Sequence, residues 1–205
     1  MRVVANKFAA LSPDIQPTRT SHRSRRSMGG FGVRDFIVDR PDHSHSIAQM
    51  SDAHVANVLR VYKSRYDALS PDHGIAHVTI FKNHGADAGA SLEHPHSQLI
   101  ATPVISHQVR ERFQQALNPH DEYGEYMFCQ SLEEEIADRQ RVVLLTEHFV
   151  ALELYASPTP FCTPIYPRLH MASFGDISAA EIADLARVLR TVLAKLYHRS
   201  GESGL

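Results

Sequence analysis

Residues 94–98 read HPHSQ, so two histidines stand two positions apart in one short run. Side chains alternate between the two faces of an extended strand, and a strand here would point both imidazoles to the same face. Pro95 withholds a backbone donor, which favours the start or an edge of a strand. A neutral imidazole is a good nucleophile towards phosphorus, so this run is a candidate for covalent phosphate chemistry.

The segment just ahead of this run, residues 83–93, is rich in glycine and alanine. Gly85 and Gly89 let the backbone approach a ligand closely, and Ser91 adds a hydroxyl donor. Backbone N–H groups of such a turn bind phosphate oxygens. A nucleophile that directly follows a phosphate-binding turn predicts a site for phosphate chemistry.

The composition predicts a folded domain with its own core. The chain has 205 residues, 43% of them hydrophobic, which suffices for one domain or a little more. A formal net charge of −2 argues against a nucleic-acid partner, which requires a strongly basic face. No run approaches the roughly 18 apolar residues of a membrane span, and the N-terminus lacks a signal-peptide pattern. We therefore expect a cytoplasmic protein in which Cys129 and Cys162 are reduced, buried thiols.

Hydrophobic periodicity predicts a mixture of strands and helices. Ser51 is a good N-cap for a helix over 52–69, where apolar residues recur at helical spacing. Residues 16–34, rich in arginine, serine and glycine, are predicted to form a solvated loop. Further strands are predicted near 2–8, 35–39, 77–83, 96–105, 141–147 and 149–156, and further helices near 106–118, 130–140 and 179–198.

Two distant segments share an outline. FIVDRPDHSHSIAQMS and FCTPIYPRLHMASFGDIS each contain a strand, a proline and a histidine. In each, an apolar residue (Ile47 or Phe174) follows four positions after the histidine. A serine that caps the next helix (Ser51 or Ser178) follows eight positions after it. The pattern favours an internal duplication of a strand-turn-helix unit.

The HPHSQ run and its glycine-rich context resemble the active site of the galactose-1-phosphate uridylyltransferases, in the transferase branch of the histidine-triad superfamily. The runs VVANKFAALSPDIQP, FIVDRPDHS, FKNHGADAGASLEHPHSQLIATP and TEHFVALELYASPTPFCTPIYPRLHMASF match in the family's order. The resemblance implies an α+β, histidine-triad-like fold, an antiparallel sheet flanked by helices. It places one full unit at residues 1–140 and an incomplete second unit at 141–205.

The resemblance also implies an activity in galactose metabolism. His96 would attack the α-phosphorus of UDP-glucose and release glucose 1-phosphate, and galactose 1-phosphate would then capture the uridylyl group. Hydrolytic relatives carry a third histidine where this chain has Gln98. Glutamine can hydrogen-bond a phosphoryl oxygen but is a poor proton shuttle, which favours transfer over hydrolysis.

The same resemblance assigns binding residues. Asn83, Ser91 and Gln98 would donate to phosphate oxygens and stabilise charge in the transition state. Gly85 and Gly89 belong to the phosphate-binding turn. Asn6 and Phe8 align with the family's nucleoside-binding run, although Lys7 stands where some members have an aspartate.

A structural zinc is a further family feature. Its ligands are a Cys-x-x-Cys pair and two histidines, which match His43 and His94 of this sequence. The cysteine pair has no counterpart here, and zinc in structural sites takes four ligands. We therefore expect zinc binding to be weak or absent, with His43 and His94 as remnants of the site. His170 repeats the position of His43 in the second unit, but nothing downstream of it could complete a site.

Two departures from the family pattern limit what the resemblance implies. Arg34-Asp35 replaces the usual His-Glu pair, and the family's C-terminal strand with its histidines has no counterpart. We interpret the chain as truncated at both ends, with the missing half supplied by a homodimer partner or a separate polypeptide. The alternatives are a nucleotide-sugar phosphorylase or hydrolase on the same scaffold, and a non-catalytic remnant that binds nucleotide.

Overall fold

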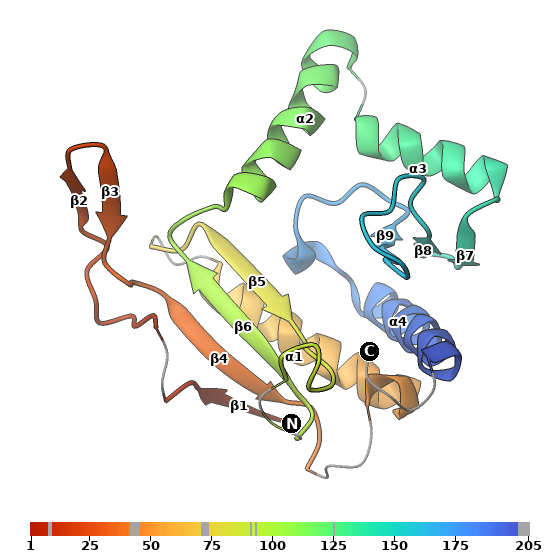
Figure 1. Ribbon diagram of the computed structural model, residues 1–205. Coiled ribbons are helices and arrows are strands. Elements are labelled where there is room, and N and C mark those ends of the chain that lie inside the picture. Colours follow the sequence, from red (N-terminus) through yellow and green to blue (C-terminus); the bar gives the residue numbers. More distant parts are fainter. Residues whose placement is uncertain are drawn as a thin grey trace. The chain divides into compact units, whose positions relative to one another are not determined.

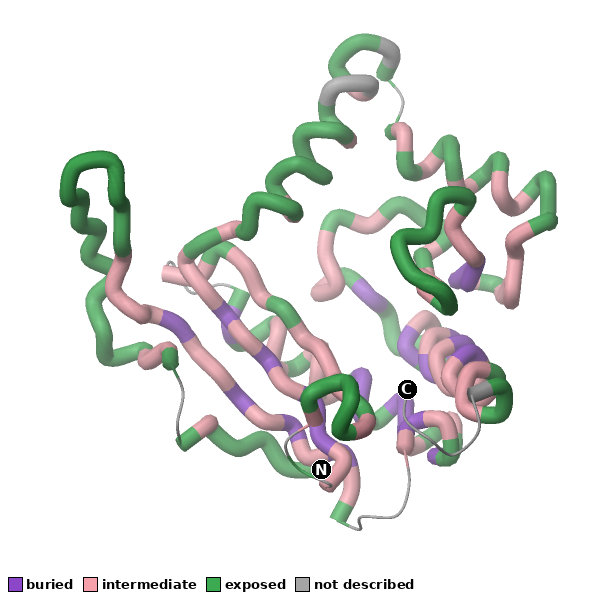
Figure 2. Tube along the Cα trace, in the orientation of Figure 1, coloured by how far each residue is buried: buried purple, intermediate pink, exposed green. Residues whose placement is uncertain are grey.

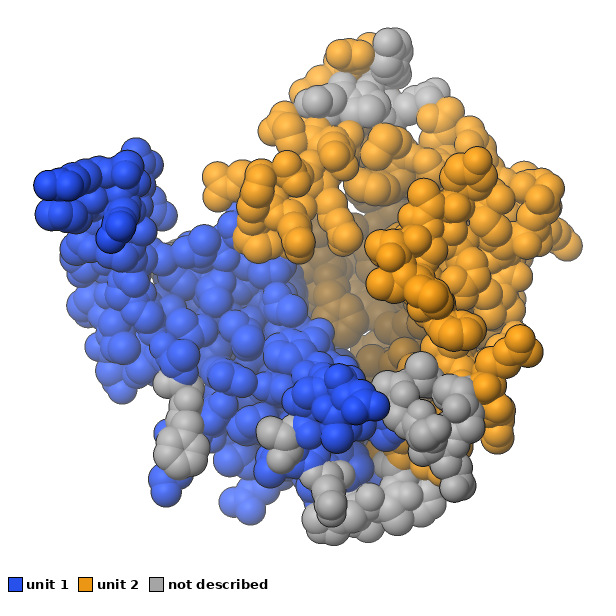
Figure 3. All heavy atoms as spheres, in the orientation of Figure 1, with its two compact units in different colours: residues 1–44, 61–105 blue, residues 45–60, 106–205 orange. Residues whose placement is uncertain are grey.

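The computed structural model describes residues 1–7, 10–41, 46–70, 74–90, 92, 94–124 and 126–200. Antiparallel sheets and helices make up an α+β fold, as the sequence predicted. The chain divides into two compact units, residues 1–44 with 61–105 and residues 45–60 with 106–205 (Figure 3). The prediction of one full unit at residues 1–140 and an incomplete second unit at 141–205 concerned related sequence units. A division by compactness does not test it, so it stays a prediction. Residues 106–140 belong to the same compact unit as the C-terminal segment.

Unit 1 is built on a four-stranded antiparallel sheet. Its strands confirm the four predicted ones and follow the order β1-β4-β6-β5, so β6 is an inner strand (Figure 1). Val38 pairs with His96 across β4 and β6, and Phe81 pairs with Gln98 across β5 and β6. The strands are β1 (Arg2–Ala5), β4 (Val33–Val38), β5 (His77–Phe81) and β6 (His96–Thr102).

One face of this sheet is buried and the other is not. Ile37, Leu99 and Ala101 are fully buried and pack with Val61, Tyr62 and Leu69 from the second half of helix α1 (Asp52–Leu69). Residues on the alternate positions of β4 and β6 are mostly half-buried, which gives the two-colour pattern of these strands in Figure 2. Full burial of a side chain such as Leu99 contributes about 1.5–3 kcal/mol. The alternation leaves one face of the sheet open to a ligand.

The predicted loop at 16–34 is wrong in its central part. Residues Arg19–His22 (β2) and Arg25–Met28 (β3) form an antiparallel hairpin. Arg23 takes a φ of 57° at its turn, and the hydroxyls of Thr20 and Ser27 meet at 2.7 Å across the strands. The two strands pair their own backbones, so the hairpin forms with almost every side chain exposed (Figure 2).

Unit 2 combines helices with a small sheet. The order β7-β8-β9 is antiparallel, and all four residues of β8 are buried. The predicted helices near 106–118, 130–140 and 179–198 and the strands near 141–147 and 149–156 are confirmed. The elements are α2 (His107–Tyr123), α3 (Met127–Asp138), β7 (Val142–Leu145), β8 (Phe149–Leu152), β9 (Ile165–Pro167) and α4 (Ala179–Ser200).

The two segments that share a sequence outline also share local structure. A 3-10 turn begins at the apolar residue in both, at Ile47 (η1, Ile47–Gln49) and at Phe174 (η2, Phe174–Asp176). The capping serine follows in both. Ser51 Oγ accepts from the His54 N–H at 3.3 Å, and Ser178 Oγ accepts from the Glu181 N–H at 3.2 Å. Both predicted caps are confirmed, and the duplication itself stays a hypothesis.

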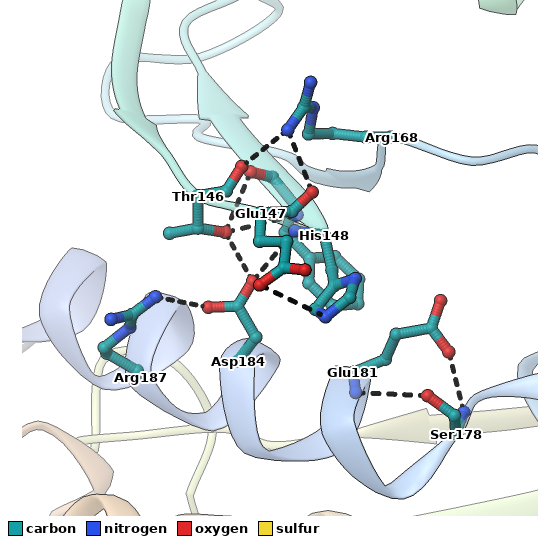
Figure 4. A network of polar contacts seen from close by, with 9 residues as sticks. Thr146, Glu147, His148, Arg168, Ser178, Glu181, Asp184 and Arg187 are labelled. Atoms are coloured by element: carbon teal, nitrogen blue, oxygen red, sulfur yellow. Dashed lines mark hydrogen bonds and ion pairs between the residues drawn. The ribbon is translucent and has the colours of Figure 1, made fainter.

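A buried carboxylate fastens α4 to the turn between β7 and β8 (Figure 4). Asp184 accepts from Thr146 Oγ1 at 2.6 Å, from the His148 N–H at 3.0 Å and from Arg187 at 2.7 Å. Burial alone would raise the pKa of Asp184, but these three donors together hold it below its ordinary value. The ionised carboxylate therefore stabilises this junction.

In the described part of the chain, every helix is too short or too polar to cross a membrane.

Candidate active site

His96 opens β6 and is 8% exposed. Its Nδ1 lies 2.8 Å from the backbone carbonyl oxygen of His94. A carbonyl oxygen only accepts, so Nδ1 carries the proton and Nε2 carries the free lone pair. The edge of the Phe36 ring packs against the imidazole, with 5.2 Å between ring centroids. These contacts fix both the tautomer and the plane of the ring.

Gln98 lies on the same face of β6 as His96, two positions along the strand. Arg34 of β4 donates from Nη2 to Gln98 Oε1 at 2.9 Å. Since a guanidinium has no acceptor, it can bind only the carbonyl end of the amide, which leaves the Gln98 NH₂ as the free end. Nε of Arg34 is buried and has no hydrogen-bond partner among the described residues. The Gln98 side-chain amide is therefore oriented with its NH₂ group as a donor on the open face of the unit 1 sheet.

The glycine-rich turn between β5 and β6 closes on itself. The Ala90 N–H donates to the Gly85 carbonyl at 3.1 Å, and the Gly89 N–H donates to the Ala86 carbonyl at 2.9 Å. Gly85 and Gly89 take φ values of 83° and 78°, a region that side chains disfavour. A Cβ added at Gly89 would stand 3.8 Å from Asn83 Nδ2, so the turn lies against the Asn83 amide. Ser91, predicted to join this site, lies outside the described residues.

Asn6 follows β1 at the edge of the sheet. Its N–H donates to the Arg34 carbonyl at 3.0 Å, which continues the β1–β4 pairing by one residue. Phe8, the other predicted nucleoside contact, lies outside the described residues. The structure thus gives a position for Asn6 and leaves its proposed role as a prediction.

Sequence reasoning missed a polar network behind the nucleophile. Asp39 is fully buried, and its Oδ2 accepts from Lys82 Nζ at 2.6 Å. Ser97 Oγ donates to Asp39 Oδ1 at 3.2 Å, and Tyr62 OH meets Ser97 Oγ at 2.5 Å. A signal was present, because Asp35, Ile37 and Asp39 alternate on one face of an apolar strand. Asp35 is also buried, and it pairs with Arg65 at 2.6 Å.

The predicted zinc ligands do not make up a metal site in the described part of the chain. His94 places Nε2 2.6 Å from the Arg40 carbonyl, so the backbone engages that nitrogen. His43 and its neighbour His45 lie outside the described residues. No three His, Cys, Asp or Glu side chains of the described residues gather into a group able to hold an ion. The expectation that zinc binding is weak or absent stays a prediction.

His170, in unit 2, meets a partner that lies upstream in the sequence. Cys129 Sγ and His170 Nδ1 are 3.3 Å apart, and the Tyr126 ring packs against the imidazole at 4.5 Å between centroids. Both Cys129 and Cys162 are free, but each is half-buried rather than buried as predicted. The prediction considered only residues after His170, whereas folding brings α3 to it.

A sequence model described as "Galactose-1-phosphate uridyl transferase, N-terminal domain" matches residues 1–106, just over half of the chain. The chain belongs to the galactose-1-phosphate uridylyltransferase family. The matched range contains His96, Gln98 and the glycine-rich turn. Family membership thus agrees with the resemblance carried by those residues.

Relatives of this uridylyltransferase-family chain carry two different names. An ADP-glucose phosphorylase from Arabidopsis thaliana is 30% identical over 96% of this chain and 55% of its own length. A galactose-1-phosphate uridylyltransferase from Thermotoga maritima is 28% identical over 93% of this chain and 59% of its own. The chain therefore spans little more than half the length of these relatives.

Solved structures show the same fold. An Arabidopsis thaliana ADP-glucose phosphorylase with bound ADP-glucose superposes with a TM-score of 0.85 at 28% identity, over 97% of this chain and 61% of that one. The structure of a uridylyltransferase mutant gives a TM-score of 0.85 at 21% identity, over 92% of this chain and 62% of that one. At that lower identity the likeness concerns the fold alone.

Proposed function

We propose that this chain transfers a nucleotidyl group through a covalent intermediate on His96. One observation carries the proposal: the His94 carbonyl lies 2.8 Å from Nδ1 of His96. That contact holds the proton on Nδ1 and keeps the lone pair on Nε2. An imidazole held in one tautomer, beside a glycine-rich turn, is suited to attack phosphorus.

The reaction has two displacement steps. Nε2 of His96 attacks the α-phosphorus of a nucleoside-diphosphate hexose, an N–P bond forms, and the bond from phosphorus to the bridging oxygen breaks. Hexose 1-phosphate leaves with that oxygen. A phosphate oxygen of the acceptor then attacks the same phosphorus and the N–P bond breaks. The Gln98 NH₂ and the turn after Lys82 supply donors for the charge that develops on the phosphoryl oxygens.

Uridylyl transfer from UDP-glucose to galactose 1-phosphate is the leading form of this reaction. Gln98, a poor proton shuttle, supports transfer over hydrolysis. Phosphorolysis of ADP-glucose is a second candidate, favoured by the ADP-glucose phosphorylase that is 30% identical. The two reactions share the step at His96 and differ in the base and in the acceptor. We further propose that the protein works in the cytoplasm.

The acceptor pocket is proposed to need more than the described residues. The chain spans 55% and 59% of the two relatives' lengths. A homodimer partner or a separate polypeptide would complete the pocket for the hexose phosphate. The first step at His96 requires only the open face of the unit 1 sheet.

Half-reactions test the proposal. The protein is incubated with UDP-glucose or with ADP-glucose, and intact mass and released glucose 1-phosphate are measured together. We expect a nucleotidyl adduct on His96 with an equal amount of glucose 1-phosphate, and loss of both in His96→Gln. His77→Gln, a change at another histidine of the same sheet, is the matched control and should keep the adduct.

The acceptor then decides between the candidates. Galactose 1-phosphate should clear the adduct if the protein is a uridylyltransferase, and inorganic phosphate should clear it if the protein is a phosphorylase. Free nucleoside monophosphate in bulk would indicate hydrolysis. If the wild-type chain forms no adduct with either nucleotide sugar, the enzyme proposal fails, and a remnant that only binds nucleotide is the alternative left to test.

A further inference from the structure

Polar side chains from three neighbouring strands meet behind the nucleophile, on the face of the unit 1 sheet that packs against α1. Asp39 directly follows β4, Ser97 lies in β6, and Lys82 directly follows β5. Val38 pairs with His96 and Phe81 pairs with Gln98, so Asp39 and Lys82 stand on opposite sides of the start of β6. Their ion pair spans that strand.

The pair also binds the backbone on both sides of His96. The Asp39 N–H donates to the Pro95 carbonyl at 3.1 Å, and Lys82 Nζ donates to the His96 carbonyl at 3.0 Å. Ser97 Oγ donates to the Asp39 carboxylate at 3.2 Å. Three consecutive residues, 95–97, are therefore each bonded to one member of the pair.

Tyr62 of α1 completes the arrangement. Burial, together with the Asp39 carboxylate, raises the pKa of Tyr62 far above its ordinary value, so its hydroxyl keeps its proton. Since Ser97 gives its proton to Asp39, the 2.5 Å contact between Tyr62 and Ser97 is a donation from Tyr62. The Asp39 carboxylate thus accepts from Lys82 Nζ and from Ser97 Oγ, and Tyr62 in turn donates to Ser97.

Stability alone is a weak reason for such a pair. Asp39 is fully buried and the Lys82 side chain is 16% exposed, so both charges have lost most of their water. Apolar residues of similar size often fill such a position with equal or greater stability. A buried pair that binds two successive backbone carbonyls and the side chain of the next residue instead fixes geometry, and the residue at its centre is His96.

We propose that the Asp39–Lys82 pair positions the nucleophile by holding residues 95–97 in place and tying them to the glycine-rich turn that starts after Lys82. Asp39 and Lys82 are positioning residues, because they act through the backbone and lie on the face opposite the imidazole. This inference rests on the proposed function only in taking His96 as the reacting group.

Paired substitutions separate positioning from stability. Lys82→Met leaves a buried carboxylate without its cation, and we expect the melting temperature to fall by about 10 °C. The double variant Asp39→Asn/Lys82→Met buries no charge, so most of that loss should be recovered. The rate of His96 adduct formation should nevertheless stay at least about tenfold below wild type in the double variant, because the bond from Lys82 Nζ to the His96 carbonyl is gone and the charged anchor for Ser97 is lost.

Hydrogen exchange gives a readout that needs no activity. Amides of residues 96–98 should exchange faster in the double variant, while those of 34–37 on the neighbouring strand should keep their protection. The matched control is Lys63→Met, which breaks the 2.8 Å exposed pair with Asp67 and should change neither rate nor exchange.

Recovery of the adduct rate together with the melting temperature in the double variant would overturn the proposal, since a purely structural pair behaves that way. Unchanged exchange at residues 96–98 would overturn it as well. If the wild type forms no adduct, the proposed function fails, and the exchange measurement alone still decides whether the pair holds this segment.

Discussion

Removing Arg34 should weaken the reaction only through Gln98. The Arg34 Nη2 to Gln98 Oε1 bond of 2.9 Å is charge-assisted, and such a bond contributes about 1.5–3 kcal/mol. Without it, the amide of Gln98 is free to turn either its NH₂ or its oxygen to the substrate. Two equally populated orientations would cost about twofold in rate. The upper limit is the full loss expected for Gln98→Ala, about 10- to 150-fold for a bond to a charged oxygen.

A double-mutant cycle measures this coupling. Adduct formation on His96 is followed under single-turnover conditions in wild type, Arg34→Met, Gln98→Ala and the double variant. We expect Arg34→Met to have almost no further effect once Gln98 is alanine. Gln98→Glu should keep the fold, because the new carboxylate pairs with Arg34, yet react as slowly as Gln98→Ala because it offers no donor. Arg26→Met, which removes the same charge from the exposed hairpin, is the control.

Independent effects would refute this reasoning. If Arg34→Met lowers the rate by the same factor in both backgrounds, the guanidinium acts on the substrate directly rather than through Gln98. If the melting temperature of Arg34→Met also falls, the lower rate of adduct formation is due to a less stable fold. Neither result would affect the role proposed for His96.

Three further predictions concern the two units and the metal. Asp184→Asn should destabilise unit 2 by about 1–3 kcal/mol in urea unfolding at pH 7. Because the pKa of Asp184 is lowered in the folded chain, its contribution is present above the ordinary value of 3.8 and is lost as the pH falls through the folded pKa. The difference in the free energy of unfolding between wild type and Asp184→Asn should therefore become smaller below about pH 4. A difference that does not change with pH would contradict the lowered pKa of Asp184. Leu99→Ala should cost about 2–5 kcal/mol in the same assay, because it opens a cavity between β6 and α1. Chelator treatment should leave the melting temperature unchanged, since His94 already binds the Arg40 carbonyl, and a clear fall would indicate a metal held by the fold.

Much of the fold followed from local patterns. The helix at Asp52–Leu69 was predicted from its serine cap and its apolar spacing, and the strand at His96–Thr102 from its alternation. The hairpin at residues 19–28 was not predicted. It buries almost nothing, so hydrophobic periodicity gives no signal for it, and its arginines and serines read as a loop. Pairing between its own two strands decides its structure.

The candidate site likewise has residues that the sequence predicts and partners that only the structure shows. His96 and Gln98 were named as site residues from the sequence, and the structure places both on one face of β6. The partners that orient them were not predicted, because Arg34 is 64 positions from Gln98 and Asp39 is 43 from Lys82. Contacts over such separations depend on the order of strands in the sheet, which spacing along the chain does not give.

The sequence by itself determined which residues can do chemistry here: a histidine, a glutamine two positions later and a turn that tolerates positive φ. These depend on residue type and on the two-residue period of a strand, both local properties. Only the tertiary structure decided how His96 is held. The strand order β4-β6-β5 sets Asp39 and Lys82 on either side of residues 95–97, and it brings Arg34 to the amide of Gln98. Pairing between strands supplies that proximity, and it forms only when the sheet assembles.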